Sequence, residues 1–294
     1  MDSVPINFCD TVGFNLVSNA TKEAVLDDLR VRFGVTPLSR RTDVLSEKNR
    51  ARIGEAPVVL QLQSTGTAYV LFLTRVGFQQ VALLIDRKVN PGFAYPKVIS
   101  LHLFFPNDMF DGTVITGELI KGVSEWIFLV DDVIAVNGKR IGSHMFRERY
   151  AVGCDILKAK HRRCRSDMFA LCMKQFFQVN QAEDMLRAAR FMPYKIKGVS
   201  IRSTGPHRRD LFVPVKVVSQ APARRLHLGA TAADDAYTVH EGEGDGDPSI
   251  GLAHVPSIET SHYLKSKFEG VPYGKRLAVT CEWNATFERW QPVP

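Results

Sequence analysis

The sequence contains few cysteines, no long apolar run and no strong excess of charge of either sign. Its five cysteines are odd in number and form no Cys-x-x-Cys pair, so they support neither a disulfide framework nor a structural zinc site. No apolar stretch reaches the roughly 18 residues that cross a bilayer, and the opening MDSVPINFCD lacks the basic and apolar segments of a signal peptide. We therefore expect no membrane partner and a reducing, intracellular location in the cytoplasm or nucleus, or a place in a virion.

The chain does contain enough apolar residues for a substantial core. Of its 294 residues, 45% are hydrophobic and 10% are aromatic, and the 18 Phe and 3 Trp are spread along the whole length. This distribution predicts one large core or two modest ones, and it argues against a small folded head with a long disordered tail. The formal charge of +7 suits an anionic partner without identifying one.

An amphipathic helix is expected near the start of the chain. Residues 22–33 place apolar side chains on one helical face. Thr21 can act as the N-cap, and Gly34 stands at the position where a helix ends.

Strand patterns dominate the next part of the sequence. Residues 58–86 consist of β-branched and aromatic clusters with breaks at Gly66 and Gly77, which is typical of successive antiparallel strands. Further strands are expected at 98–105, 113–120 and 126–136, the last closed by the turn pair Asn137-Gly138.

A helical period returns over residues 166–192. Met168, Cys172 and Phe176 fall on one stripe, and Asn180 is placed to open a second helix. We expect these two helices to flank the sheet.

The composition changes after residue 216. The chain becomes rich in Pro, Ala and Arg, then acidic, and it ends in a strand-like run at 277–283. The acidic segment 241–247 has regular glycines, but its carboxylates would repel a phosphate, so a solvated loop is expected. These features predict a second, smaller β domain.

Six segments carry a recognisable pattern. They are QSTGTAYVLFLTRVGFQQVALLIDRK at 63–88, TVITGELI at 113–120, WIFLVDDVIAVNGK at 126–139, KGVSI at 197–201, DLFVPVK at 210–216 and GKRLAVTCEWNATFERWQPVP at 274–294. In order and spacing this set resembles the signatures of mRNA-capping guanylyltransferases, particularly those of large DNA viruses. The resemblance implies an α+β fold in which an antiparallel-sheet nucleotidyltransferase domain (1–216) precedes an OB-fold-like domain (217–294) without the family's final signature.

The resemblance also implies a chemistry whose key residue is missing. In that family a lysine amine attacks the α-phosphate of GTP to form a lysyl-GMP adduct, and the GMP is then transferred to a diphosphate RNA end. The matching position is Gln63, whose conjugated amide nitrogen is not nucleophilic. Covalent catalysis of this kind is therefore not expected at that position.

Other polar positions of the family's motifs are changed as well. The motif aspartate and arginine fall at Thr65 and Ala68, the Asp of Asp-Gly-Glu at Thr116, the guanine-stacking aromatic at Asp131, the Asp before Gly198 at Lys197, and the phosphate-clamping lysines at Val213 and Val215, with Lys216 one residue out of register. Losing three charged donors, at Gln63, Val213 and Val215, removes roughly 5 kcal/mol of nucleotide affinity, which is over a thousandfold.

Some residues remain candidates for a ligand. Glu118 and Asp132 could contact a metal or a ribose, although acids near strand ends are more often ordinary surface or hydrogen-bonded residues. Basic side chains could follow an RNA backbone or form a solvated face; they are Lys158, Lys160, Arg162, Arg163, Arg165, Arg208 and Arg209, with Arg224 and Arg225 further on.

Two further readings are set aside. His161, Cys164 and Cys172 have a spacing that fits no common metal site, so we expect no metal and no cofactor. Lys48 could be proposed as a displaced nucleophile, but it lacks the strand-turn context that the family's lysine occupies.

Three functions follow from this sequence. The first is a pseudoenzyme that acts with protein partners as a structural or interaction subunit of a virion or of a capping or transcription assembly. The second is a module that binds an RNA 5′ end or cap without chemistry. The third is an active guanylyltransferase that draws its missing groups from elsewhere in the chain or from a partner.

Overall fold

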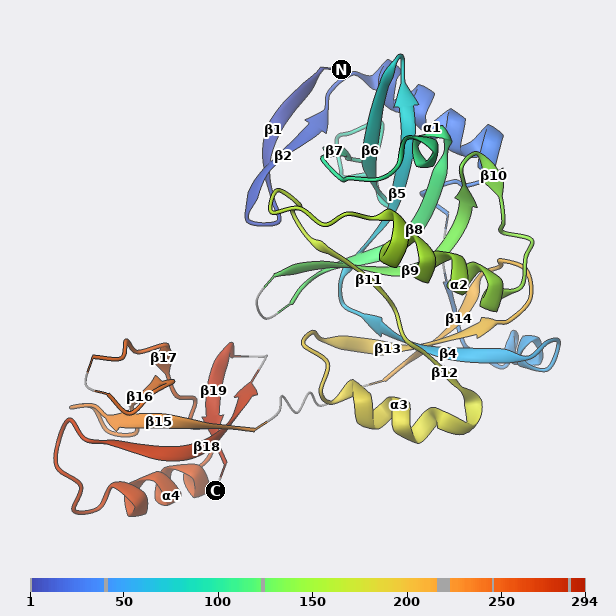
Figure 1. Cartoon of the computed structure of the whole chain (residues 1–294). Helices are drawn as coiled ribbons and strands as arrows, with labels where there is room; N and C mark the ends of the chain where they lie inside the picture. Colours follow the sequence, from blue (N-terminus) through green and yellow to red (C-terminus); the bar gives the residue numbers. More distant parts are fainter. Residues whose placement is uncertain are drawn as a thin grey trace. The chain divides into compact units, whose positions relative to one another are not determined.

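The chain folds into two compact units. Figure 1 presents the computed structural model, which describes residues 2–39, 42–122, 125–215, 223–244, 246–284 and 287–293. One unit comprises Met1–Met185 and Ile196–Lys216, and the other comprises Leu186–Lys195 and Val217–Pro294. The boundary that we expected between residues 216 and 217 lies outside the described residues.

The first unit is built on a nine-stranded sheet in the order β1-β2-β7-β6-β5-β8-β9-β10, with β11 added beside β9. Its strands are β1 (Ser3–Phe8), β2 (Thr11–Leu16), β5 (Thr67–Val76), β6 (Gln79–Asp86), β7 (Val98–Leu101), β8 (Thr113–Lys121), β9 (Trp126–Val136), β10 (Lys139–Arg140) and β11 (Ala170–Met173). The path is antiparallel throughout, whereas β11 runs parallel to β9. The β9–β10 turn at Asn137-Gly138 has two positive φ angles, 49° and 77°, as a tight hairpin turn of that sequence requires.

A second, five-stranded sheet lies in a separate layer of the same unit (Figure 1). Its order is β12-β4-β13-β14-β3, with strands β12 (Phe176–Gln178), β4 (Val58–Ser64), β13 (Ile196–Ser203), β14 (Asp210–Pro214) and β3 (Thr42–Val44). The three strands expected within residues 58–86 therefore exist, but only β5 and β6 pair with each other. β4 crosses to the second sheet, and its last residues include Gln63, the position that the resemblance assigns to the family's lysine.

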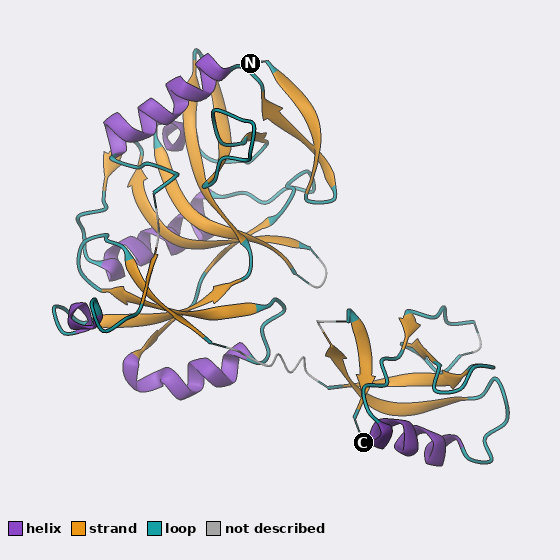
Figure 2. Cartoon of the chain, turned by 180° about the vertical axis from the view of Figure 1, so that it is seen from behind, coloured by secondary structure: helices purple, strands orange, loops and turns teal. Residues whose placement is uncertain are grey.

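Helix α1 (Asn19–Phe33) covers the outer face of the large sheet (Figure 2). Its buried side chains Val25, Leu29 and Phe33 pack with Val70 and Phe72 of β5 in one apolar cluster. The opposite face of β5 contributes Tyr69, Leu71 and Leu73 to a second cluster. The sheet is thus buried on both faces, as its near-continuous apolar strands indicate.

The start of α1 differs from the prediction. Ser18, not Thr21, is the N-cap: the Ser18 hydroxyl accepts the Thr21 backbone N–H at 3.2 Å, so the helix begins three residues earlier than expected. Gly34 ends the helix with φ 68°, a left-handed conformation that glycine adopts without strain.

The helix predicted over the first part of residues 166–192 is wrong. This segment forms β11 and β12, and α3 (Ala182–Ala189) is the one α-helix there. The spacing of Met168, Cys172 and Phe176 is four residues, which keeps side chains on one face of a strand as well as of a helix, so it could not distinguish the two. Helix α2 (Phe146–Asp155), which packs against β9, was not expected.

The second unit contains a five-stranded antiparallel sheet in the order β17-β16-β15-β18-β19. Its elements are β15 (Arg224–Ala230), β16 (Tyr237–His240), β17 (Gly251–Leu252), α4 (Ile258–Phe268), β18 (Arg276–Asn284) and β19 (Arg289–Pro292). The His254 N–H donates to the Trp290 carbonyl at 2.7 Å and so links the two ends of the sheet. A small five-stranded sheet that nearly closes on itself is typical of an OB fold, and the predicted α+β class is confirmed.

No helix in the described parts of the chain is both long and apolar enough to cross a membrane.

Candidate functional site

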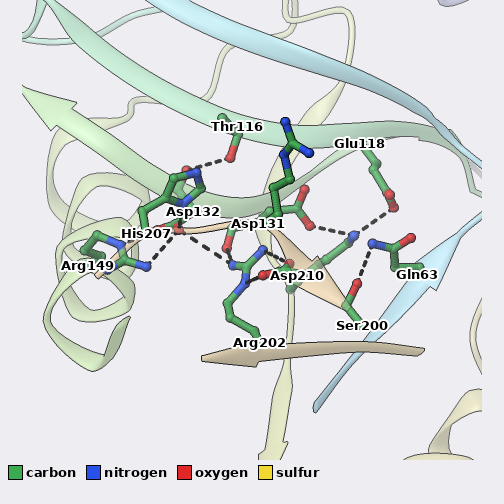
Figure 3. A network of polar contacts seen from close by, with 12 residues as sticks. Gln63, Thr116, Glu118, Asp131, Asp132, Arg149, Ser200, Arg202, His207 and Asp210 are labelled. Carbon is green, nitrogen blue, oxygen red and sulfur yellow. Dashed lines mark hydrogen bonds and ion pairs between the residues drawn. The ribbon is translucent and has the colours of Figure 1, made fainter. Parts of the chain in front are cut away.

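Gln63 occupies the predicted nucleophile position and is buried, with 4% of its surface exposed. It lies near the end of β4, paired with Gly198 of β13. Its side-chain amide donates to the Ser200 hydroxyl (Figure 3). The position therefore holds a neutral amide that is bonded to the neighbouring strand.

Glu118 and Asp131 share one buried lysine that the sequence did not single out. The Lys174 ammonium lies 2.7 Å from a Glu118 carboxylate oxygen and 2.6 Å from Asp131 Oδ1, and all three side chains are at most 4% exposed. Glu118 also accepts hydrogen bonds from the Ser64 hydroxyl, at 2.8 Å, and from the Ser64 backbone N–H. Lys197 approaches Glu118 from the surface at 3.8 Å.

Lys174 was missed because its segment was predicted to be helical. It directly follows β11, and its backbone N–H donates to the Val130 carbonyl at 2.9 Å, which continues the parallel pairing with β9. This pairing carries its side chain to Asp131, the next residue of β9. The continuous apolar run at 169–173 fits a short strand as well as a helix, so no clear signal for it was present in the sequence.

Asp132 is surrounded by three cationic or polar groups (Figure 3). Arg149 of α2 forms a two-pronged pair with both of its oxygens, at 2.9 and 3.0 Å, and His207 Nδ1 lies 2.9 Å from Oδ2. Burial raises the pKa of Asp132, but the His207 hydrogen bond and the charges of Arg202 and Arg149 outweigh burial and hold the pKa well below its usual range. Asp132 is therefore an ionised carboxylate with its partners supplied by the chain.

Arg202 of β13 closes the network. It pairs with Asp210 through two nitrogens, at distances from 2.7 to 3.1 Å, and donates to the Asp131 backbone carbonyl at 2.7 Å. Burial opposes the charge, but the neighbouring carboxylates of Asp210 and Asp132 outweigh it and raise the pKa of the guanidinium further.

These side chains form one ion network at the face between the two sheets of the first unit. Its buried cations are Arg149, Lys174 and Arg202, and its buried carboxylates are Glu118, Asp131, Asp132 and Asp210. The cations that could attract a phosphate are thus already paired with carboxylates of the protein. We call this set the ion network.

The other predicted positions add little polar chemistry. Thr65 is exposed, Ala68 is half-buried beside its strand partner Glu118, and the Thr116 hydroxyl reaches the Asp132 carbonyl only at 3.5 Å. The half-buried Val213 and Val215 lie at the β14 side of the second sheet. Lys216 lies outside the described residues.

Three glycines of the family's motifs are held in place by packing. A Cβ atom on Gly66 would lie 2.6 Å from the Leu119 carbonyl oxygen, one on Gly117 would lie 2.5 Å from the Leu129 carbonyl oxygen, and one on Gly198 would meet a backbone oxygen of β14 at 2.3 Å. No side chain fits at such distances, so each glycine is required by the approach of neighbouring strands.

The basic residues considered for RNA binding are exposed, but three of them form ion pairs with carboxylates of the chain. Arg163 pairs with Glu125, Arg208 with Glu55 at 3.0 Å, and Arg209 with Asp43 at 3.7 Å. For the other four, no ion pair is found within the described residues; these are Lys158, Lys160, Arg162 and Arg165. Lys158 and Lys160 lie in the π-helical segment η3 (Ile156–Lys160) that follows α2, and Arg162 and Arg165 lie between η3 and β11.

The three residues considered above for a metal site, His161, Cys164 and Cys172, do not form one in the structure. His161 is buried 3.4 Å from Asp167, and burial lowers the pKa of its imidazole, while Cys172 is exposed on β11. Within the described residues, no three His, Cys, Asp or Glu side chains are arranged to hold a metal ion.

Comparison with known proteins gives one family. The family of the mRNA capping enzyme catalytic domain matches residues 34–207. No curated protein sequence matches the chain. Among solved structures, Chlorella virus DNA ligase-adenylate is 11% identical with a TM-score of 0.36, and the comparison covers 87% of this chain and 100% of the ligase. A mycobacterial DNA ligase D complexed with ATP and MES is 10% identical with a TM-score of 0.35, covering 80% and 86%.

Proposed function

The chain belongs to the family of the mRNA capping enzyme catalytic domain, and from this premise we propose that it is a non-catalytic member that serves as a structural or interaction subunit of a larger assembly. The observation that carries the proposal is the position of Lys174. Its ammonium bridges Glu118 of the Asp-Gly-Glu strand and Asp131, the position of the family's guanine-stacking aromatic. A nucleoside between those two positions would have to displace the lysine.

Displacing Lys174 is costly. Breaking a buried ion pair costs about 3–5 kcal/mol when one partner loses its counter-charge. The chain offers no lysine donors at Val213 and Val215 to offset this loss. We expect GTP to bind far more weakly than to a catalytic member.

Lys174 is also a poor substitute for the absent nucleophile. Attack on phosphorus needs a nitrogen that can approach the phosphate, whereas the Lys174 nitrogen is engaged by two buried carboxylates at 2.7 and 2.6 Å. Gln63 offers only an amide.

The retained glycines support selection for the fold. Gly66, Gly117 and Gly198 each sit where a strand approaches too closely for a side chain, so they are needed whether or not the site reacts. By contrast, no cation stands at Gln63, Val213 or Val215, where the resemblance places the family's lysines.

The test is covalent labelling. Full-length protein is incubated with α-labelled GTP and Mg²⁺ and run on a denaturing gel beside an active capping enzyme. We expect no labelled band from the wild type and none from Gln63→Lys. A lysine at position 63 does not restore the phosphate-clamping lysines absent at Val213 and Val215, and it does not move Lys174 from between Glu118 and Asp131. A wild-type band would overturn the proposal, and its loss in Lys174→Met would identify Lys174 as the nucleophile.

Binding of RNA is a second candidate, favoured by the exposed cations at Lys158, Lys160, Arg162 and Arg165. Capped and uncapped RNA are titrated at two salt concentrations against the wild type and a variant with all four changed to Glu. Phosphate contacts predict a steep salt dependence and at least a tenfold loss in the variant. The matched control is Lys265→Glu with Lys267→Glu in α4. Equal effects in both variants would refute a specific RNA surface, and a cap preference would favour a cap-binding role over scaffolding.

A further inference from the structure

A polar cavity of about 160 Å³ lies on the other face of the large sheet from the ion network. Side chains alternate along β5, so Tyr69, which lines the cavity, points away from the face of Ala68 and its strand partner Glu118. The edge strand β1 contributes Asn7 to the opposite wall. The cavity is therefore separate from the site described above.

Two buried polar groups in this cavity have unused hydrogen-bonding capacity. Asp86 is 4% exposed, and its carboxylate interacts with the backbone N–H groups of Lys88, at 3.1 Å to Oδ1, and of Arg87. Tyr69 is 7% exposed, and no hydrogen bond to its hydroxyl is found within the described residues. Both side chains line the cavity, so a ligand that enters it can form hydrogen bonds with them.

The rim of the cavity carries the opposite charge. Lys88 and Lys97 line it and are exposed, and both act on the Asp86 carboxylate electrostatically. Two ammonium groups above one carboxylate leave a net positive mouth over a hydrogen-bond-accepting floor. This arrangement suits a ligand that is anionic at one end and carries a hydroxyl at the other.

The size of the cavity limits the ligand. Pockets for drug-sized molecules measure about 300–1,000 Å³, so this cavity is too small for a nucleoside triphosphate. We propose that the cavity binds a small phosphorylated polyol, with the phosphate at Lys88 and Lys97 and a hydroxyl donating to Asp86. A bare anion is expected to bind more weakly than the polyol, because it brings no hydroxyl group that can donate to Asp86.

The proposal is tested by calorimetric titration of the full chain with ribose 5-phosphate, inorganic phosphate and ribose. We expect saturable binding of ribose 5-phosphate at least tenfold tighter than that of either fragment. Asp86→Asn is expected to weaken it at least tenfold, and Lys88→Ala with Lys97→Ala at least tenfold with a reduced salt dependence. Lys139→Ala, an exposed lysine of β10, is the matched control and should bind like the wild type.

Three outcomes overturn the proposal: no saturable binding by the wild type, equal binding of phosphate and ribose 5-phosphate, or binding that neither cavity variant weakens. The lysine variant changes only exposed side chains, so it remains informative if Asp86→Asn were to disturb folding. None of these outcomes bears on covalent labelling by GTP, which is measured separately.

Discussion

The two faces of the large sheet handle buried charge in opposite ways. On one face, the carboxylates of the ion network each have a cation of the chain beside them, as Asp132 has Arg149. On the other, Asp86 is equally buried, and the hydrogen bonds found for it within the described residues come from backbone N–H groups. A site whose polar groups saturate one another has little left to offer a ligand, whereas unpaired groups keep that capacity.

The largest expected effect is from breaking the ion network at Arg202. Arg202→Met leaves Asp210 buried without a counter-charge, so we expect the free energy of unfolding to fall by about 3–5 kcal/mol. Urea unfolding at pH 7 measures it. Arg163→Ala, which removes only the exposed pair with Glu125, is the control and should cost less than about 1 kcal/mol. Equal losses in the two variants would mean that the network is not the stabilising element.

A smaller effect is expected at Lys174. Lys174→Met removes the cation from Glu118 and Asp131, yet Lys197 stays near Glu118 and limits the loss to about 3 kcal/mol. Lys174→Arg keeps the charge and should recover part of the stability. The comparison fails if Lys174→Met unfolds at the same urea concentration as the wild type, because the ion pairs would then contribute nothing.

The smallest effect has the opposite sign and is expected at Asp86. Burial raises the pKa of Asp86, so the folded protein favours the protonated form; the stability that this gives is present at low pH and lost as pH rises through the raised pKa. At pH 7 the buried, ionised carboxylate therefore costs stability, and Asp86→Asn should raise the melting temperature by about 2 °C. The gain should vanish below the ordinary pKa of Asp. A lower melting temperature at pH 7 would show that Asp86 has a stabilising partner.

Much of the fold could be predicted from local pattern, but the site could not. β9 was predicted with its observed bounds because an apolar run ends in the turn pair Asn137-Gly138. The pairing of β4 with β13 instead of β5 depends on contacts between residues over a hundred positions apart, which no local pattern carries.

The same limit applies to the polar residues. Gln63, Glu118 and Asp131 were singled out by motif position, whereas Arg149, Lys174 and Arg202 belong to no motif and were missed. They come from α2, from the residue after β11 and from β13, and only the folded structure brings these segments to the carboxylates of the ion network. Motif positions therefore identified the acidic members of the network but not the cations that pair with them.

The glycines at 66, 117 and 198 have a consequence for how relatives of this chain are recognised. Because each position admits no side chain, it will persist in descendants that have given up nucleotide chemistry altogether. Searches that weight these letters will collect active and inactive sequences alike. Position 63 already carries a side chain, so strand packing does not fix its identity in the same way.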